Sequence, residues 1–534
     1  MSAAPAARAR RPPTVGVLPP LDPAARPAGP PAAPPAVDRG RQRLLEMAPG
    51  LVVWTILLAP VAIGFLIVST NFQYLWILGL GALALDAYWL FRIIYTVRFV
   101  FRGWRLLQET GQVDWMGRCD ALRPGPEVLD PATIVHAVLI PTYTERYDVL
   151  RATVEALVAA EYPADRKICA MISRASDTAG CENIARLQAE FGGRLRAFWH
   201  IKDPLLPGIV VGKSAAMAYG GPALKAACDG LGLDPSRVVV TDLDSDFRVH
   251  RQYFAHITHE YCAAPDRDTS IWQPVPVFSN NYWRVPAPVR CLATFTTQWQ
   301  FYLHQHPHRL VMFSSYSMAL QMLDTVGYWD DDVIPEDSRF FWKAFFTFGE
   351  RLHVRPTFLP MYGDAPRARD YGGTLVSQYN QIKRWAWGVT DIPYVAPRML
   401  SHKEIPRRVR LRRFRLLLFN HLSWATLPLL ILIGGALPSL VNYDYGLSVT
   451  GTVLATAASL ILQITLANIL VLVIIDNRLH PRPAHWPWWR RRFADGQMAV
   501  YPVIFLLLSV LPALEAQTRL LSGAYLEYRV TEKE

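Results

Sequence analysis

Residues 238–247 read VVVTDLDSDF, and this stretch decides the fold. Three β-branched valines favour a buried strand. A buried strand has no place for unpaired carboxylates, so the strand must end where the acids begin. Asp242 and Asp244 are two residues apart, which directs both side chains to one side of an extended backbone. One Mg²⁺ or Mn²⁺ ion can bind both, because these ions prefer carboxylate and phosphate oxygens. The alternative is that the aspartates open a turn or cap a helix.

The sequence around this stretch alternates between short apolar runs and helical periodicity. Further strands are predicted at 134–140, 168–172 and 195–200, and helices at 148–160, 181–191 and 213–228. This alternation predicts a mostly parallel, Rossmann-like α/β sheet with helices on both faces. Ligands of such sheets bind beyond the carboxyl ends of the strands, and the aspartates follow one of these ends.

Long apolar runs flank the α/β region. Four are long enough to cross a bilayer, which takes about 20 residues, and they cover residues 51–70, 72–90, 416–441 and 447–475. A fifth run, 499–511, is shorter, with Pro502 inside it and Pro512 directly after it. We interpret it as a re-entrant or interfacial helix, or as a fifth span.

The chain has 534 residues and a net charge of +11, and its arginines gather beside the apolar runs. They lie before the first run, before the third at 407–415, and after the fourth at 490–493. The positive-inside rule therefore places these segments and the α/β region in the cytosol. A basic chain also suits nucleic acid, but the membrane rule accounts for the arginines and we expect no nucleic-acid partner. None of the six cysteines forms a CxxC pair, which is typical of a reducing compartment.

The predicted organisation has five parts. Residues 1–45, rich in Pro, Ala and Arg, are expected to be disordered. The others are two transmembrane helices and an interfacial helix in 46–110, a cytosolic domain in 130–400, two transmembrane helices in 410–476, and a basic loop, interfacial or re-entrant helix and tail in 477–534. Within the first membrane part, 93–108 mixes Arg with aromatic residues and is predicted to be the interfacial helix. Such a chain is predicted to be an integral protein of the plasma (inner) membrane.

Two polar motifs of the middle region have both functional and structural interpretations. Lys213 begins a predicted helix in VGKSAAMAYG, residues 211–220, whose glycine spacing is one residue short of a P-loop. A helix start favours phosphate, and a solvated lysine is the alternative. Glu336 and Asp337 precede an aromatic amphipathic stretch. They offer a general base or simply favourable charge at a helix N-terminus.

A third motif is QIKRWAWG, residues 381–388. Gln381, Arg384 and Trp385 stand at i, i+3 and i+4, which makes them neighbours on one helical face. Arg can bind a diphosphate, and an indole ring can stack on a sugar. The alternative is a surface helix with an aromatic anchor at the membrane.

The order of these motifs carries more information than any one of them. A DxD, then an acidic pair roughly 90 residues later, then QxxRW roughly 45 residues further, all between apolar runs, resembles the membrane-integrated family 2 glycosyltransferases. Cellulose and hyaluronan synthases are members of that family. The resemblance covers about residues 134–390 and the flanking apolar runs, and implies a GT-A-like fold.

The resemblance also implies roles for particular residues. PTYTE at 141–145 is similar to the nucleotide-binding loop of the family, which assigns Pro141, Thr142, Tyr143 and Glu145 to the nucleotide-sugar. Asp242 and Asp244 would hold the metal and the uridine diphosphate, and Lys213 would contact the donor. Asp337, with Glu336 beside it, would be the general base. Gln381, Arg384 and Trp385 would bind the diphosphate and the acceptor sugar.

One segment of the chain departs from the family pattern, and another segment resembles a further part of it. The second strand of the family ends in paired acids, whereas this chain has Ser173 and Arg174 there, so Asp177 is the acid expected to stand in for them. VTEK, residues 530–533, resembles the cytosolic segment that follows an interfacial helix in these synthases.

The function implied is inverting transfer of a sugar from a nucleotide-sugar, expected to be UDP-linked, to a growing polysaccharide, with Mg²⁺ or Mn²⁺ as cofactor. One alternative is a single addition to a lipid-linked acceptor. A non-enzymatic alternative is a membrane scaffold or transporter that carries a degenerate transferase domain.

Overall fold

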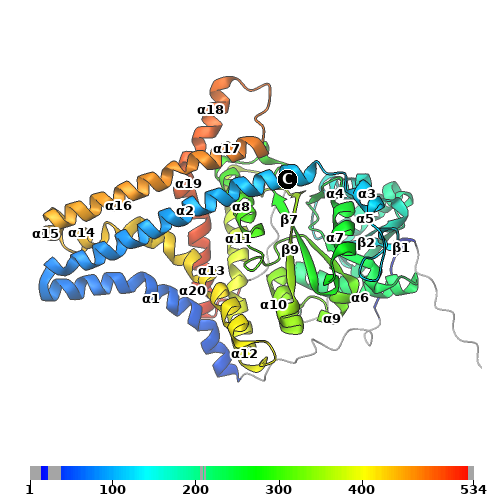
Figure 1. Ribbon diagram of the computed structural model, residues 1–534, viewed down its shortest axis with the longest axis horizontal. Helices are drawn as coiled ribbons and strands as arrows, with labels where there is room; N and C mark the ends of the chain where they lie inside the picture. Colours follow the sequence, from blue (N-terminus) through cyan, green and yellow to red (C-terminus); the bar gives the residue numbers. More distant parts are fainter. Residues whose placement is uncertain (1–13, 22–37, 205–208, 210–211, 527–534) are drawn as a thin grey trace, which may run out of the picture. The chain divides into compact units, whose positions relative to one another are not determined.

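The computed structural model describes residues 14–21, 38–204, 209 and 212–526. Its chain divides into two compact units (Figure 1). The first comprises Met1–Ala33, Leu107–Val277 and His306–Asp364, and the second comprises Pro34–Leu106, Phe278–Gln305 and Ala365–Glu534. Each unit is described by itself below.

The first unit is built on one nine-stranded sheet in the order β1-β4-β3-β2-β5-β8-β7-β9-β6. Its strands are β1 (Val15–Val17), β2 (Val135–Pro141), β3 (Lys167–Arg174), β4 (Ala197–Asp203), β5 (Val238–Asp242), β6 (Arg248–Val249), β7 (Ser270–Val277), β8 (Tyr316–Ala319) and β9 (His353–Tyr362). The five strands β1 to β5 are parallel to one another. Strand β8 is antiparallel to both β5 and β7. The predicted mostly parallel α/β sheet is confirmed.

Helices connect the parallel strands. They are α4 (Tyr147–Ala159), α5 (Thr178–Phe191) and α6 (Lys213–Gly230), and the unit also contains α3 (Trp115–Ala121), α7 (Tyr253–Ala263), α9 (Leu320–Val326) and α10 (Glu336–Phe348). The connecting helices agree with the sequence predictions to within a few residues. Strands β2 and β5 are buried along their whole length, which explains their runs of apolar residues without polar alternation.

The order of the parallel strands creates a switch point between β2 and β5. From β2 the chain first builds outward through β3 and β4, and then returns to place β5 on the other side of β2. Leu139 of β2 pairs with Asp242 of β5 in the sheet register. The segments that follow the two strands therefore begin side by side, which is where parallel α/β sheets bind their ligands.

The disorder predicted for residues 1–45 is wrong for those residues that the structure describes. Val15–Val17 form β1, which pairs with β4, and helix α1 begins at Arg39. The amide of Phe198 donates to the carbonyl of Thr14 over 2.7 Å. An edge strand such as β4 leaves one row of backbone groups unpaired, and β1 satisfies that row. Residues 1–13 and 22–37 lie outside the described part of the chain.

The second unit is helical. Its helices are α1 (Arg39–Asn71), α2 (Trp76–Gly111), α8 (Ala287–His304), α11 (Tyr371–Ala386), α12 (Asp391–Ser401), α13 (Arg407–Gly434), α14 (Leu437–Val441), α15 (Tyr443–Leu447), α16 (Val449–Ala467), α17 (Ile469–Leu479), α18 (Trp488–Gly496), α19 (Tyr501–Phe505) and α20 (Leu511–Ser522). Among the described residues, four helical stretches are long and apolar enough to cross a membrane: Arg39–Gly111, Arg407–Gly434, Val449–Leu479 and Trp488–Ser522. The first contains both of the predicted N-terminal spans, joined by a short turn at Phe72–Leu75.

Two details of the helical unit differ from the sequence predictions. The interfacial helix predicted at 93–108 is not separate, because α2 continues through it from Trp76 to Gly111. The run 499–511 belongs to the longer stretch Trp488–Ser522, which passes through a π-helical turn at Leu506–Val510. Pro502 and Pro512 do not interrupt it because each lies in the first turn of its helix, where the missing N–H is not needed.

Candidate active site

Three carboxylates converge on the ammonium group of Lys213 at the carboxyl end of β5. The Nζ atom lies 3.2 Å from Oδ2 of Asp242, 2.6 Å from Oδ1 of Asp244 and 3.0 Å from Oε1 of Glu336. Lys213 is the first residue of α6, Asp242 is the last residue of β5, and Glu336 is the first residue of α10. The fold thus brings three distant sequence motifs into one cluster within the first unit.

The cluster is buried and carries an excess of negative charge. The side chain of Asp242 is 0 % exposed and that of Lys213 is 14 % exposed. Burial raises the pKa of Asp242 well above its usual range, and Lys213 opposes that shift. For Lys213, burial acts to lower the pKa, but the attraction of Asp242, Asp244 and Glu336 outweighs it and the pKa is raised. The lysine therefore stays charged, and it is a counter-ion to the acids.

Ser314 connects Asp244 to Asp337. Its backbone N–H donates to Oδ2 of Asp337 over 3.0 Å, and its hydroxyl donates to Oδ2 of Asp244. The next residue, Ser315, accepts a hydrogen bond from the backbone N–H of Asp244 over 3.1 Å. Ser314 has a φ of 61°, and a non-glycine residue in this left-handed region costs of order 1–3 kcal/mol. Strain of this kind is characteristic of functional sites.

Sequence reasoning missed Ser314. It lies in the stretch FSSYS, residues 313–317, which leads into β8 and contains no glycine or asparagine to signal a positive φ. Only the antiparallel insertion of β8 next to β5 brings this segment to the aspartates.

Asp337 has the properties of a general base. Burial and the neighbouring charge of Glu336 raise its pKa to about 7, and this rise is opposed by Lys213 and by the backbone N–H groups of Ser314 and Ser338. The amide of Ser338 donates to Oδ1 of Asp337 over 2.7 Å. A base is most effective when its pKa lies near the working pH, so this carboxylate is suited to accept a proton near neutrality.

The loop after β2 lies at the switch point beside Asp242. Its backbone is fixed, since the N–H and hydroxyl of Thr142 both donate to the carbonyl of Ile172, over 2.7 and 2.9 Å. The amide of Tyr143 donates to Glu145 over 2.6 Å. The guanidinium of Arg174, at the end of β3, stacks 4.5 Å from the ring centroid of Tyr143. Ends of neighbouring strands thus build one wall of the candidate site.

Asp177 has a structural role in the first unit. Its Oδ1 caps α5 by accepting a hydrogen bond from the amide of Gly180 over 2.9 Å. Its Oδ2 is buried and accepts no hydrogen bond from the residues that the structure describes. The expected stand-in for the paired acids of the family is therefore an N-cap that still has one free oxygen, and its role toward a nucleotide stays a prediction.

The carboxylates fit a divalent cation of the Mg²⁺ or Mn²⁺ type. The candidate metal ligands are all carboxylate oxygens. They converge on one point, where the positively charged ammonium of Lys213 lies within 3.2 Å of each of them. Apart from the ammonium of Lys213 near Oδ2, the oxygens of the buried Asp242 have no polar partner among the described residues. Those residues contain no group of three or more His, Cys, Asp or Glu side chains arranged to hold a metal alone. The set therefore suits an ion that takes one or two carboxylates and completes its shell with phosphate and water.

Gln381, Arg384 and Trp385 lie together on α11, as predicted, in the second unit. Gln381 is buried and accepts a hydrogen bond from Gln378 over 3.2 Å. The opposite side of α11 is held by Glu515 of α20, which accepts from Tyr379 over 2.8 Å and from Lys383 over 3.0 Å. Sequence reasoning missed Glu515 because it lies in a helix that follows an apolar run, more than 130 residues after Lys383.

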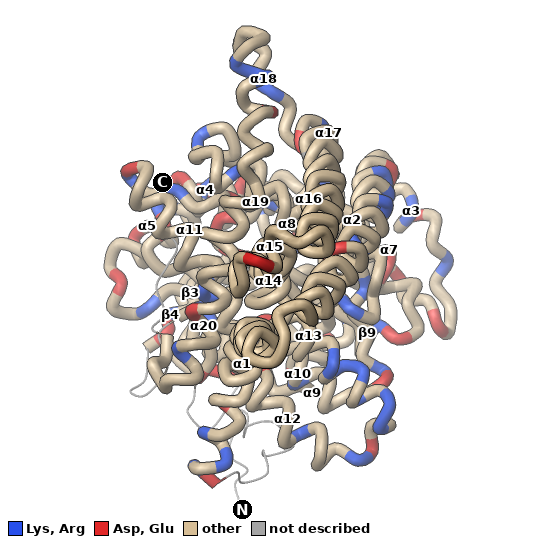
Figure 2. Tube along the Cα trace, turned by 90° about the vertical axis from the view of Figure 1, so that its left-hand side faces the viewer, with Lys and Arg blue, Asp and Glu red and all other residues tan. Residues whose placement is uncertain are grey.

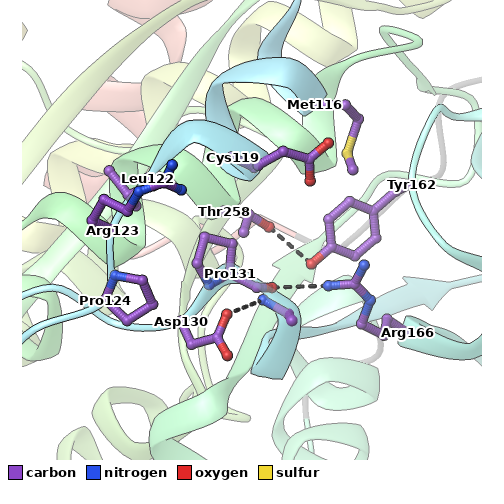
Figure 3. A pocket seen from close by; sticks show the side chains of 12 residues that line it. Met116, Cys119, Leu122, Arg123, Pro124, Asp130, Pro131, Tyr162, Arg166 and Thr258 are labelled. Atoms are coloured by element: carbon purple, nitrogen blue, oxygen red, sulfur yellow. Dashed lines mark hydrogen bonds between the residues drawn. The ribbon is translucent and has the colours of Figure 1, made fainter.

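A separate cavity opens at the amino ends of β2 and β3 (Figure 3). It has a volume of about 320 Å³ and is lined by residues that include Cys119, Asp130, Tyr162 and Arg166. Arg166 donates to the carbonyl of Pro131 over 2.9 Å, and Thr258 donates to the hydroxyl of Tyr162 over 3.1 Å. None of the predicted site residues lines this cavity.

Part of the chain, including Asp242, Asp244 and Glu336 of the acidic cluster, is similar to a known family. Residues 239–475 match the sequence model of a family described as glycosyl transferase family group 2. The match covers less than half of the chain, and the matched residues resemble a family 2 glycosyltransferase domain. The predicted enzyme class is thereby confirmed, and so is the GT-A-like fold, while a specificity like that of cellulose or hyaluronan synthases stays a prediction. The matched region includes Asp242, Asp244, Asp337 and the QxxRW residues.

Two solved structures resemble the chain at low identity. One is the mannosyltransferase PcManGT from Pyrobaculum calidifontis in complex with GDP-Man and Mn²⁺, with 14 % identity, a TM-score of 0.43, and coverage of 81 % of this chain and 99 % of that chain. Another is residues 1–349 of S. aureus TarS in complex with UDP-GlcNAc, with 12 % identity, a TM-score of 0.34, and coverage of 74 % and 93 %. No curated protein matches the chain.

Proposed function

We propose that this protein is an inverting membrane glycosyltransferase that moves a sugar from a nucleotide-sugar, UDP-linked in our proposal, to a growing polysaccharide. The observation that carries this proposal is the buried cluster of Lys213, Asp242, Asp244 and Glu336 beside Asp337 at the switch point of the sheet. A structural protein has no need of several acids buried together, since burying like charges costs free energy.

The donor is proposed to bind at the ends of β2 and β5. Asp242 and Asp244 would hold Mg²⁺ or Mn²⁺, and the 141–145 loop would border the nucleotide. When bound, the ion supplies positive charge for the diphosphate, which the three carboxylates alone would repel. Lys213 is proposed to contribute a second positive charge, because the attraction of the surrounding acids outweighs burial and keeps its ammonium protonated.

The chemical step is a displacement at the anomeric carbon. Asp337 accepts the proton of an acceptor hydroxyl, whose oxygen then forms a bond to the anomeric carbon while the bond to the UDP oxygen breaks. Attack from the face opposite the diphosphate inverts the configuration. Gln381, Arg384 and Trp385 are proposed to bind the diphosphate and the acceptor sugar, and the support is their QxxRW spacing on one face of α11.

The membrane location is part of the proposal. Support comes from the four long apolar helical stretches and from the arginines beside them, which favour a cytosolic catalytic domain in the plasma (inner) membrane. Exposed apolar side chains on α1, such as Leu58, Phe65 and Leu66, are consistent with contact to lipid.

The proposal is tested with the purified full chain in detergent. A panel of UDP- and GDP-sugars is supplied with Mg²⁺ or Mn²⁺, and release of the nucleoside diphosphate is measured together with product length on gels. We expect release from one UDP-sugar and a ladder of long products. If the product is instead a lipid that has gained a single sugar, the acceptor is lipid-linked and the proposal of polysaccharide synthesis is wrong. No release from any donor by a folded chain that binds UDP would overturn the transferase proposal and favour a scaffold or transporter.

A further inference from the structure

Helix α18 exposes three large aromatic side chains. Trp488 is 77 % exposed, Trp489 58 % and Phe493 65 %, and only Ala494 is buried within the helix. Each ring would gain free energy by leaving water. Clustered exposed aromatics of this kind mark a surface that another phase or molecule covers.

The exposed residues share one face of α18. Positions 488, 489, 492 and 493 are neighbours at helical spacing, so Trp488, Trp489 and Phe493 surround Arg492, whose side chain is 80 % exposed. Arg490 lies at the edge of this face, with its guanidinium 4.2 Å from the ring centroid of Trp486. The face therefore combines aromatic rings with guanidinium groups, and Figure 2 shows the band of basic residues on α18.

Buried charges fix α18 to the end of α17. Arg482 bridges the two helices, with its Nη1 2.9 Å from Asp476 of α17 and its Nη2 2.6 Å from Asp495 of α18. The carboxylate of Asp476 is fully buried and also accepts from Tyr282 and Thr294, over 2.6 and 2.8 Å. The aromatic face is thus held in a fixed orientation and is not part of a loose loop.

The position of α18 along the chain indicates what covers its face. It follows the apolar stretch Val449–Leu479 after a short connection and forms the start of the stretch Trp488–Ser522, ahead of the helices α19 and α20 (Figure 1). Helices that lie at a membrane surface carry Trp and Phe at the depth of the headgroups and Arg beside them. Guanidinium groups also form paired hydrogen bonds with phosphate. Protein interfaces are also enriched in Trp, Phe and Arg, so it is the position of α18 between the apolar stretches that favours lipid, and a protein partner is an outcome of the test.

We propose that α18 is an anionic-lipid binding site, in which Trp488, Trp489 and Phe493 enter the headgroup region of the cytosolic leaflet while Arg490 and Arg492 bind lipid phosphates. This inference rests on the proposed membrane integration but not on the transferase activity. The ligand class is a phospholipid with a net negative headgroup, and the site holds α18 flat on the bilayer beside the last apolar helices.

The test places a fluorescent donor on α18 in the full chain. Gly496 is a suitable position for a labelled cysteine, because a Cβ there meets no atom within 4 Å, and of the six native cysteines five are buried and Cys181 is partly buried. The labelled protein is reconstituted in phosphatidylcholine nanodiscs that contain a trace of acceptor dye on either phosphatidylglycerol or phosphatidylcholine. We expect energy transfer to both dyes and an enrichment of the phosphatidylglycerol dye of roughly fivefold or more, since each basic residue at an anionic surface contributes about that factor.

Variants separate the two parts of the site. The double variant Arg490→Gln/Arg492→Gln should keep the energy transfer but lose the preference for phosphatidylglycerol. Replacing the three aromatics by Ser should weaken transfer to both dyes. The matched control, Arg123→Gln/Arg251→Gln, changes two exposed arginines of the first unit and should leave the preference unchanged.

Two results would overturn the proposal. One is equal transfer to both dyes in the protein with its native α18, and the other is no transfer to either, which would leave α18 as a surface for a protein partner. Failure of the membrane proposal itself is distinguishable, because such a chain would be released from membranes by alkaline carbonate before any nanodisc is made.

Discussion

The ammonium group of Lys213 lies 2.6 Å from Oδ1 of Asp244 and 3.2 Å from Oδ2 of Asp242. The first residue of α6 is thus the counter-ion of the acids that end and follow β5. Because the side chain of Asp242 is fully buried, removing the lysine leaves this carboxylate without its counter-ion. The pairing therefore couples the stability of the sheet to the electrostatics of the candidate active site.

Lys213→Met should destabilise the protein by about 3–5 kcal/mol, because it leaves a buried carboxylate without its partner. The melting temperature of the purified chain, followed by intrinsic fluorescence, measures this effect. The control is Lys225→Met on the same helix, whose ion pair with Asp229 is partly exposed and should contribute little. Equal melting temperatures for the two variants would contradict the role of Lys213 as a buried counter-ion.

Asp337→Asn should reduce the rate of sugar transfer by about 10²–10⁴-fold, which is the usual contribution of a general base. The substitution keeps the shape of the side chain, so UDP binding should stay nearly unchanged when titrated by calorimetry. Glu350→Gln, at an exposed acid just after α10, is the control and should retain full activity. If Asp337→Asn transfers sugar at the native rate, Asp337 is not the general base.

The rate of transfer should depend on pH through Asp337. Since its pKa is raised to about 7 and a base must be unprotonated, kcat/KM should fall as the pH is lowered through that value. The apparent pKa belongs to the coupled cluster of Asp337, Glu336 and Lys213. A profile that stays flat between about pH 5 and about pH 8 would contradict this prediction.

The raised pKa of Asp337 also predicts how the free energy of unfolding depends on pH. Between the ordinary value of 3.8 and about 7, the folded state binds the Asp337 proton more tightly than the unfolded state. Its contribution to the free energy of unfolding is therefore fully present below pH 3.8, falls as the pH rises through this window, and is lost above about 7. Melting curves of the native chain and of Asp337→Asn across this range should diverge accordingly.

Asp244→Asn should weaken UDP binding in the presence of Mn²⁺ by about tenfold or more, since even the outer partners of a metal site contribute about that factor. When a chelator removes the divalent ions, the native chain and the variant should bind UDP equally weakly. Titration of UDP with and without Mn²⁺ separates the two effects. A variant that keeps the full Mn²⁺ enhancement would show that Asp244 is not a metal ligand.

Glu515 is expected to position α11, the helix that carries the QxxRW residues. Glu515→Lys should raise the KM for the acceptor while leaving the KM for the donor unchanged, because it turns the contact with Lys383 into a repulsion. The effect should be roughly two- to fivefold, the size of a partly exposed ion pair. The exchanged pair Lys383→Glu/Glu515→Lys should restore the KM, whereas a purely structural defect would not be rescued by the exchange.

Local sequence signals were sufficient for four of the nine strands, β2 to β5. The valines of 238–240 and the acids that follow them located the end of β5, and the alternation around them gave the parallel strands. These signals work because burial on both faces imposes apolar runs, and because carboxylates cannot enter a buried strand. The motif order then gave the enzyme class, which the family match confirmed.

Tertiary structure decided the features that depend on contacts between distant residues. Ser314 reaches Asp244 and Asp337 only because β8 inserts antiparallel beside β5. Val15–Val17 became a strand because the edge of β4 has unpaired backbone groups. The pKa of Asp337 is raised by burial and by Glu336 together. By itself the sequence determined the order of the motifs from which the candidate site was predicted, whereas burial and non-local charge, which no local pattern encodes, decided how Lys213, Asp242 and Asp337 are tuned.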